Sequence, residues 1–211
     1  MKFYKKSNSF RESYIDTLGK LYDYSTIRYA NNKVSKVIDT DKEYTYAGFK
    51  AQCDSLSKQL TQFGIGASDK VAILSQNMPE WTVAFFATVP FGRIAIPILP
   101  ESSANEVTNI LNHSESKVLF VSKKLLPNVS RECIDKLTLI DIETFEFIKQ
   151  DNDKFTCDGK VAMPMPDDIA TIIYTSGTTG NAKGVVLSHR NLTSCVASCF
   201  HAQPRNEKDR W

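Results

Sequence analysis

Residues 71–96 read VAILSQNMPEWTVAFFATVPFGRIAI. The apolar run at residues 71–74 predicts a buried strand, and residues 79–91 predict a helix with Pro79 in its first turn. Residues 94–96 predict a second buried strand. Short apolar strands separated by a helix favour a parallel sheet whose faces are covered by helices.

The alternation of strand and helix continues downstream. Ser103 and Glu106 have the spacing of a capping box, which predicts a helix over residues 103–113. Apolar runs predict further strands at residues 118–121 and 137–140, and residues 142–150 are predicted to be helical. The fold class that we expect is therefore α/β, with mainly parallel sheets covered by helices.

The N-terminal segment predicts two helices and a short hairpin. Residues 9–29 are expected to be helical, and residues 36–40 and 43–46 are expected to form two strands. A second helix follows, with Thr45 as its N-cap and Gly64 at its end. Its apolar residues recur at steps of four and three and form one stripe: Phe49, Cys53, Leu56, Leu60 and Phe63.

A polar stretch near residue 150 divides the chain. We expect residues 1–150 to form an α/β subdomain, residues 151–168 to form a linker, and residues 169–211 to form a phosphate-loop segment. In that last segment we predict strands at 169–174 and 184–187, followed by a helix over 190–202 that Ser188 caps.

The composition excludes several classes of protein. Hydrophobic residues make up 42% of the 211-residue chain, and the net charge of +2 gives no general attraction to nucleic acid. The most apolar stretch, residues 81–100, is interrupted by Pro90, Gly92, Arg93 and Pro97, so no membrane-spanning helix is expected. The start of the chain lacks the apolar run of a signal peptide. Five scattered cysteines indicate a reducing, cytoplasmic setting and buried thiols rather than a metal site.

The clearest chemistry lies between the last two predicted strands, where residues 175–184 read TSGTTGNAKG. A triphosphate carries several charges on oxygens that accept many hydrogen bonds, so its binding requires donors that converge without side-chain bulk. Glycines let the backbone approach, hydroxyls donate, and a lysine adds positive charge. The expected phosphate-binding residues are Thr175, Ser176, Gly177, Thr178, Thr179, Gly180 and Lys183.

Two familiar phosphate-binding motifs do not fit this segment. A Walker loop has its Gly-Lys pair followed directly by Ser or Thr and a helix, whereas Lys183 is followed by Gly184 and a β-branched run. A dinucleotide fingerprint needs glycines at its first, third and sixth positions, which the segment lacks. The prediction is therefore a strand, a phosphate loop and a strand; the alternative without a ligand is a flexible Ser/Thr-rich turn.

Residues 174–185, YTSGTTGNAKGV, resemble the phosphate-loop signature of the adenylate-forming superfamily. This superfamily includes acyl- and aryl-CoA synthetases, firefly luciferase and the adenylation domains of nonribosomal peptide synthetases. The likeness continues through residues 186–191 and departs at Ala182, where the superfamily commonly has proline. Segments elsewhere in the chain also resemble superfamily regions and look most similar to long-chain fatty acid–CoA ligases: 44–46, 77–81, 92–97 and 207–211.

The resemblance implies an enzyme with two half-reactions. A carboxylate attacks the α-phosphorus of ATP, giving an acyl-adenylate and pyrophosphate, and the thiol of coenzyme A then displaces AMP. The implied cofactors and substrates are ATP with Mg²⁺, a carboxylic acid and coenzyme A. Residues 175–179 would bind the β- and γ-phosphates, and Lys183 would screen the departing pyrophosphate. No nucleic-acid partner is expected, and peripheral contact with a membrane is compatible with this function.

The resemblance further implies that the chain is the N-terminal part of a longer ligase. The superfamily's adenine-binding stretch, Mg²⁺-binding glutamate, ribose-binding aspartate and catalytic lysine have no counterpart in these residues. We therefore expect neither a catalytic residue nor a metal ligand here, and no acyl-CoA formation by this chain alone. Two alternatives stay open: adenylation of another acid (aryl, short-chain or amino acid), and a non-catalytic nucleotide-binding module.

Several histidine and aromatic residues outside the loop are expected to have structural roles. His189 follows the loop, and we expect it to shape the start of the last helix rather than approach a phosphate. His113 and His201 have no evident partners in the sequence and are expected at the surface or at helix ends. Trp81 and the pair Phe85-Phe86 are expected to pack in the core rather than line an acyl tunnel.

Overall fold

The computed structural model describes residues 15–37, 43–149, 161–175 and 183–202 of the chain. Its helices, including two short 3-10 helices labelled η, are α1 (Leu18–Arg28), α2 (Tyr46–Gln62), α3 (Pro79–Thr88), η1 (Val89–Phe91), α4 (Ala104–Ser114), η2 (Leu126–Asn128), α5 (Arg131–Lys136) and α6 (His189–Ala202). Its strands are β1 (Lys33–Lys36), β2 (Glu43–Thr45), β3 (Lys70–Leu74), β4 (Ile94–Ile98), β5 (Val118–Val121), β6 (Thr138–Asp141), β7 (Phe147–Lys149), β8 (Ile169–Thr175) and β9 (Lys183–Ser188).

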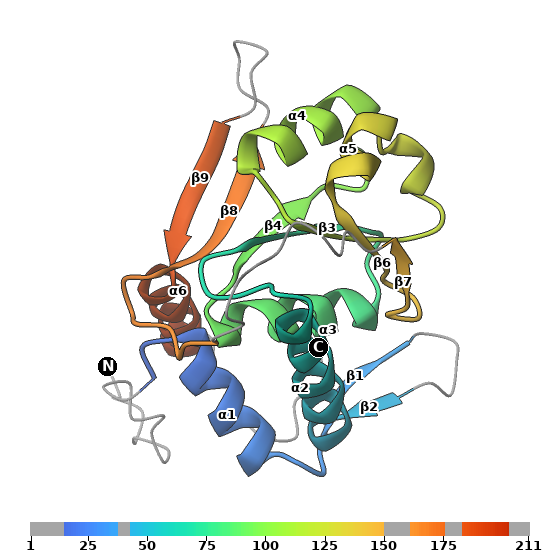
Figure 1. The fold of residues 1–211 in the computed structure, drawn as a ribbon. Coiled ribbons are helices and arrows are strands. Elements are labelled where there is room, and N and C mark those ends of the chain that lie inside the picture. The colour runs from blue at the N-terminus through green and yellow to red at the C-terminus, as the bar shows by residue number, and fades with distance from the viewer. Residues whose placement is uncertain (1–14, 38–42, 150–160, 176–182, 203–211) are drawn as a thin grey trace.

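A seven-stranded sheet with the order β7-β6-β5-β3-β4-β8-β9 forms the centre of the molecule (Figure 1). The strands from β6 to β8 in this order are parallel, whereas β7 and β9 run antiparallel at the two ends. Val71 of β3 lies opposite Ala95 of β4 on one side and Val118 of β5 on the other. The expected α/β class with a mainly parallel sheet is confirmed.

Helices cover both faces of this sheet (Figure 1). On one face α4 and α5 pack on β3 to β6 through residues such as Val107, Leu111 and Cys133. On the other face α2 and α3 pack through Leu60 and Val83, among others. The strands of the centre are almost entirely buried, which explains their continuous apolar runs.

The topology reverses at β3 and thereby defines a ligand-binding edge. The chain passes from β3 through α3 to β4, then returns through α4 to β5 on the other side of β3. In such sheets, ligands bind outside the carboxyl ends of the strands. The carboxyl end of β8 lies at this same edge, because β8 is parallel to β4.

The helix ends follow the predicted capping chemistry. Thr45 accepts a hydrogen bond from the Gly48 amide at 3.1 Å, and Gly64 follows α2 with a φ of 75°. Ser103 and Glu106 form a reciprocal capping box at the start of α4. Trp81, Phe85 and Phe86 pack against the core on the α2–α3 face, with the rings of Trp81 and Phe85 stacked at 5.5 Å.

The prediction of a helix at residues 142–150 is wrong. The chain turns at Phe145, which has a φ of 60°, and residues 147–149 form β7, antiparallel to β6. The Phe147 ring lies 4.2 Å from the ring of Phe63, so packing on α2 selects a strand there.

Three further boundaries differ from the prediction. Helix α1 begins at Leu18, after residues 15–17, because Thr17 is its N-cap and accepts from the Lys20 amide at 3.1 Å. Residues 9–14 of the predicted helix lie outside the described part. Strand β1 lies at Lys33–Lys36 rather than at 36–40, of which residues 38–40 lie outside the described part. Helix α5, capped by Ser130, was not predicted. Its six residues are too few to show a helical period.

The proposed division of the chain stays a prediction. Residues 150–160 lie outside the described part, and β8 joins the same sheet as β3 to β6. Among the described residues, no helix has both the length and the apolar character that crossing a bilayer requires.

Candidate phosphate-binding site

Strands β8 and β9 hold the two ends of the predicted phosphate loop side by side. Thr175, the last residue of β8, pairs with Lys183, the first residue of β9. Ser176, Gly177, Thr178, Thr179 and Gly180 lie in the segment 176–182, which is outside the described residues. The predicted arrangement of strand, loop and strand is therefore present at its two ends, at the carboxyl edge of the parallel sheet (Figure 1).

The pair of residues next to these ends is tightly packed. Tyr174 lies opposite Gly184 across the two strands. A Cβ atom added to Gly184 would lie 2.8 Å from Cγ2 of Ile172 and 3.4 Å from Cζ of Tyr174. A side chain at position 184 would therefore displace the end of the Ile172 side chain and lie against the tyrosine ring, which gives this glycine a role in packing as well as in the loop sequence.

Tyr174 is also held from the other side by α4. Its hydroxyl lies 2.7 Å from Nδ1 of His113, and the two rings meet edge to face at 5.7 Å. Burial raises the pKa of Tyr174, which keeps the phenol protonated. His113 lies exposed in the last turn of α4, as expected of a surface or helix-end residue, but it has a partner that was not evident in the sequence. The contact joins residues 61 positions apart, and no local pattern signals it.

Lys183 is exposed at the start of β9 and forms no ion pair with the residues that the structure describes. Thr175 is exposed as well. One ammonium group and one hydroxyl group are thus presented together at the mouth of the strand pair. Such groups are suited to phosphate oxygens.

His189, the first residue of α6, serves the fold. Its side chain is fully buried, and its Nδ1 accepts a hydrogen bond from the Leu18 amide at 3.2 Å. Burial lowers the pKa of His189, while the charge of Asp168 opposes that shift. The ring therefore joins α6 to α1, as expected from a residue that shapes the helix start. Ser188 caps the helix, accepting from the Asn191 amide at 3.2 Å.

The two exposed cysteines contradict the expectation of buried thiols. Cys53 and Cys133 are buried, whereas Cys195 and Cys199 are exposed. Thr193 and His189 are buried on the inner face of α6, and positions 195 and 199 fall on a different, exposed face of the helix. Among the described residues, no group of three or more His, Cys, Asp or Glu side chains could hold a metal ion.

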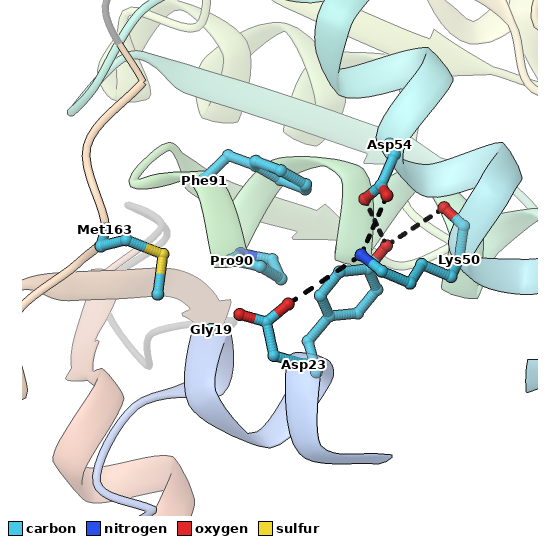
Figure 2. A pocket seen from close by; sticks show the side chains of 8 residues that line it. Gly19, Asp23, Lys50, Asp54, Pro90, Phe91 and Met163 are labelled. Atoms are coloured by element: carbon cyan, nitrogen blue, oxygen red, sulfur yellow. Dashed lines mark hydrogen bonds and ion pairs between the residues drawn. The ribbon is translucent and has the colours of Figure 1, made fainter. Parts of the chain in front are cut away.

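Two hollows elsewhere are unsuited to a nucleotide. One lies between α1, α2 and η1 and has a volume of about 50 Å³ (Figure 2). Ligand sites usually have several hundred Å³. Within it, Asp54 accepts from the Tyr22 hydroxyl at 2.7 Å and pairs with Lys50 at 2.9 Å, so its polar groups bind one another.

The second hollow is an open groove of about 550 Å³ where α2 and α3 begin, beside the turn after β6. It is lined by the carboxylates of Glu43, Glu80 and Glu143. Their negative charge repels phosphate. The basic and hydroxyl groups at the ends of β8 and β9 therefore form the better candidate site.

Comparison with known proteins agrees with this geometry. The long-chain-fatty-acid–CoA ligase FadD13 of Mycobacterium tuberculosis is 32% identical over 169 residues, which cover 75% of this chain and 32% of that ligase. Fatty acyl-CoA synthetase A of Dictyostelium discoideum is 28% identical over 178 residues, covering 74% of this chain and 26% of that protein. The chain thus spans about a third or less of the length of these relatives.

Structural and family comparisons extend the likeness to most of the chain. The inhibitor-bound crystal structure of the N-terminal domain of FACL13 from Mycobacterium tuberculosis has a TM-score of 0.77 and 26% identity, covering 92% of this chain and 50% of that one. The family model described as AMP-binding enzyme matches residues 27–211. The chain therefore belongs to the AMP-binding enzyme family, as shown by this match and supported by the shared fold and the paired ends of the loop.

Proposed function

We propose that this chain is the N-terminal part of an AMP-forming long-chain fatty acid–CoA ligase and binds the phosphates of ATP with residues 175–183. The observation that carries this proposal is the pairing of Thr175 with Lys183 at the carboxyl edge of a parallel sheet. The pairing puts the two ends of a Ser-, Thr- and Gly-rich loop next to each other. The names of FadD13 and of fatty acyl-CoA synthetase A support the choice of acid.

The first half-reaction forms an acyl-adenylate. A carboxylate oxygen of the fatty acid attacks the α-phosphorus of MgATP, and the bond from that phosphorus to the bridging oxygen breaks. The departing pyrophosphate carries the bonding electrons. Thr175, Ser176, Gly177, Thr178 and Thr179 would donate to the β- and γ-phosphate oxygens. Lys183 would offset the charge that gathers on pyrophosphate.

The second half-reaction transfers the acyl group. The sulfur of coenzyme A attacks the carbonyl carbon of the adenylate, AMP leaves with the electrons of the broken C–O bond, and a thioester results. We assign the groups for this step to other parts of the full-length ligase. Both relatives are more than twice as long as this chain. We place the reaction in the cytoplasm, where the free thiols of Cys53 and Cys133 stay reduced.

Titration of pyrophosphate against the chain tests the loop assignment. Lys183→Ala should weaken binding roughly tenfold to a hundredfold, because a hydrogen bond to a charged group contributes about 1.5–3 kcal/mol. Lys124→Ala removes the same charge from an exposed site after β5 and should leave the dissociation constant unchanged. Equal affinity of the wild type and Lys183→Ala would contradict the charge role, and absence of binding by the wild type would contradict the proposal itself.

The chain alone should bind phosphate without completing catalysis. In an assay of ATP–pyrophosphate exchange with a fatty acid, we expect no turnover above that of Lys183→Ala. Exchange clearly above that variant would show that these residues form a complete adenylation site. It would thereby refute the expectation that adenylation also needs residues from the rest of a longer enzyme.

A further inference from the structure

We propose that His113 is a positioning residue for the phosphate loop. Through the hydroxyl of Tyr174 it fixes the strand that leads into Thr175. The inference rests on the proposed function, since it concerns how that same loop is held. His113 itself does not need to touch a phosphate for this role.

The geometry places His113 and Gly184 on two sides of one ring. Nδ1 of His113 lies 2.7 Å from the Tyr174 hydroxyl, and the rings meet at an interplanar angle of 86°. On β9, Gly184 lies opposite Tyr174, and a Cβ atom there would approach Cζ of the ring to 3.4 Å. The ring of Tyr174 therefore connects the last turn of α4 with both strands.

This connection lies one residue from each end of the loop. Tyr174 directly precedes Thr175, and Gly184 directly follows Lys183. The two pairs, Tyr174 with Gly184 and Thr175 with Lys183, are successive steps of one antiparallel ladder. A shift of the tyrosine ring therefore moves both groups that frame the loop.

Strand β9 needs such a support because, among the described residues, it is the end strand of the sheet. Within the described part of the chain, β9 pairs with β8 alone. Val185 and Val186 are 46% and 52% exposed, so burial contributes little to holding this strand. Edge strands with few buried contacts open locally at low free energy. The hydrogen bond to α4 ties Tyr174 of β8, and with it the paired end of β9, to a well-packed helix.

The buried state of Tyr174 keeps its hydroxyl available for this hydrogen bond. The tyrosine is 9% exposed, and its hydroxyl stays protonated because burial disfavours the phenolate. A protonated hydroxyl can donate to Nδ1 of His113 or accept from it, according to the tautomer of the ring. An asparagine at position 113 would present its amide group close to the position of Nδ1, with an oxygen that accepts and a nitrogen that donates, so it should preserve the hydrogen bond in either direction.

Pyrophosphate binding by the 211-residue chain tests the inference. Tyr174→Phe removes the hydroxyl and keeps the ring, and His113→Ala removes the ring nitrogen that bonds to it. Each should raise the dissociation constant about three- to tenfold, as expected from the loss of one hydrogen bond that orients the site. The double variant should bind no worse than either single variant, because both remove the same bond. His113→Asn should restore binding to within about twofold of the wild type.

Ser103→Ala is the matched control for stability. It removes the cap at the other end of α4, where the Ser103 hydroxyl accepts from the Glu106 amide at 3.3 Å. It should lower the melting temperature but leave pyrophosphate affinity unchanged.

The outcomes separate the inference from the proposed function. The inference would be overturned if Tyr174→Phe and His113→Ala bound pyrophosphate with wild-type affinity while their melting temperatures fell. That result would show that the contact is purely structural. Lack of binding by the wild type would refute the proposed function, and the inference with it.

Discussion

At the scale of single residues, Arg93 is the buried charge on which the α2–α3 face depends. Its side chain is fully buried at the start of β4. The guanidinium donates to the carbonyl of Ile65 at 3.0 Å, to Oγ of Ser57 at 2.8 Å and to Oγ1 of Thr61 at 2.6 Å. It thereby ties the sheet to α2 and to the loop that follows α2.

Replacing Arg93 should destabilise the protein strongly. Arg93→Met keeps the volume but leaves several buried oxygens without a donor, so the free energy of unfolding should fall by about 3 kcal/mol or more. Urea denaturation followed by circular dichroism measures this loss. Arg131→Met, at an exposed position of α5, should change stability by about 0.5 kcal/mol or less. A loss below about 1 kcal/mol for Arg93→Met would contradict the role given to its hydrogen bonds.

At the scale of elements, glycine has opposite roles in the β8–β9 pair and in α2. Gly184 lies where any side chain meets Ile172 and Tyr174. Gly48 lies in the first turn of α2, and the nearest atom to an added Cβ would be Oγ1 of Thr45 at 3.4 Å. The first position excludes a methyl group, while the second accommodates it.

The same substitution should therefore have opposite effects at the two glycines. Gly184→Ala forces the strand pair to shift and should lower the free energy of unfolding by about 1–3 kcal/mol. Gly48→Ala restricts the unfolded chain and favours the helix, so the free energy of unfolding should rise by about 0.5–1 kcal/mol. Thermal unfolding of both variants measures the difference. If Gly184→Ala were as stable as the wild type, the packing described between β8 and β9 would be wrong.

At the scale of the whole molecule, α1 and α6 join distant parts of the sequence. The hydrogen bond from the Leu18 amide to Nδ1 of His189 spans 171 residues. Thr193 of α6 adds a hydrogen bond at 3.3 Å to the carbonyl of Asp16. The two helices also lie side by side in Figure 1.

This junction should make stability depend on pH. Burial lowers the pKa of His189 in the folded protein, so between that value and the unfolded value of about 6.5 the unfolded state binds more protons. The contribution of neutral His189 to the free energy of unfolding is complete above about pH 6.5. It is lost as the pH falls from there through the pKa of His189 in the folded protein. The slope from this one group is at most about 1.4 kcal/mol per pH unit.

Denaturation at a series of pH values between about 7 and 5 tests the assignment. His189→Asn keeps an acceptor near the Leu18 amide but cannot be protonated, so its stability should fall less on acidification than that of the wild type. Equal slopes for the two proteins would show that other groups cause the pH dependence.

The sequence by itself determined the elements whose causes are local. Apolar runs predicted β3, β4, β5, β6 and β8 to within a residue or two, because buried parallel strands need continuous apolar side chains. The β-branched run after Lys183 predicted β9 equally closely, although this strand is antiparallel and largely exposed. Thr45, Ser103 and Ser188 predicted helix starts, because a cap acts within one turn. The order of hydroxyls, glycines and Lys183 predicted a phosphate loop, and that assignment stays a prediction for Ser176 to Gly180.

Only the tertiary structure decided which distant side chains meet. His113 and Tyr174 are 61 residues apart, and Leu18 and His189 are 171 apart, so no local period could reveal either contact. Residues 147–149 became a strand because Phe147 packs on Phe63 beside β6, which overrode the helical pattern read from 142–150. Backbone propensity differs by only about 1 kcal/mol between such alternatives, so burial against a neighbouring element selects the outcome.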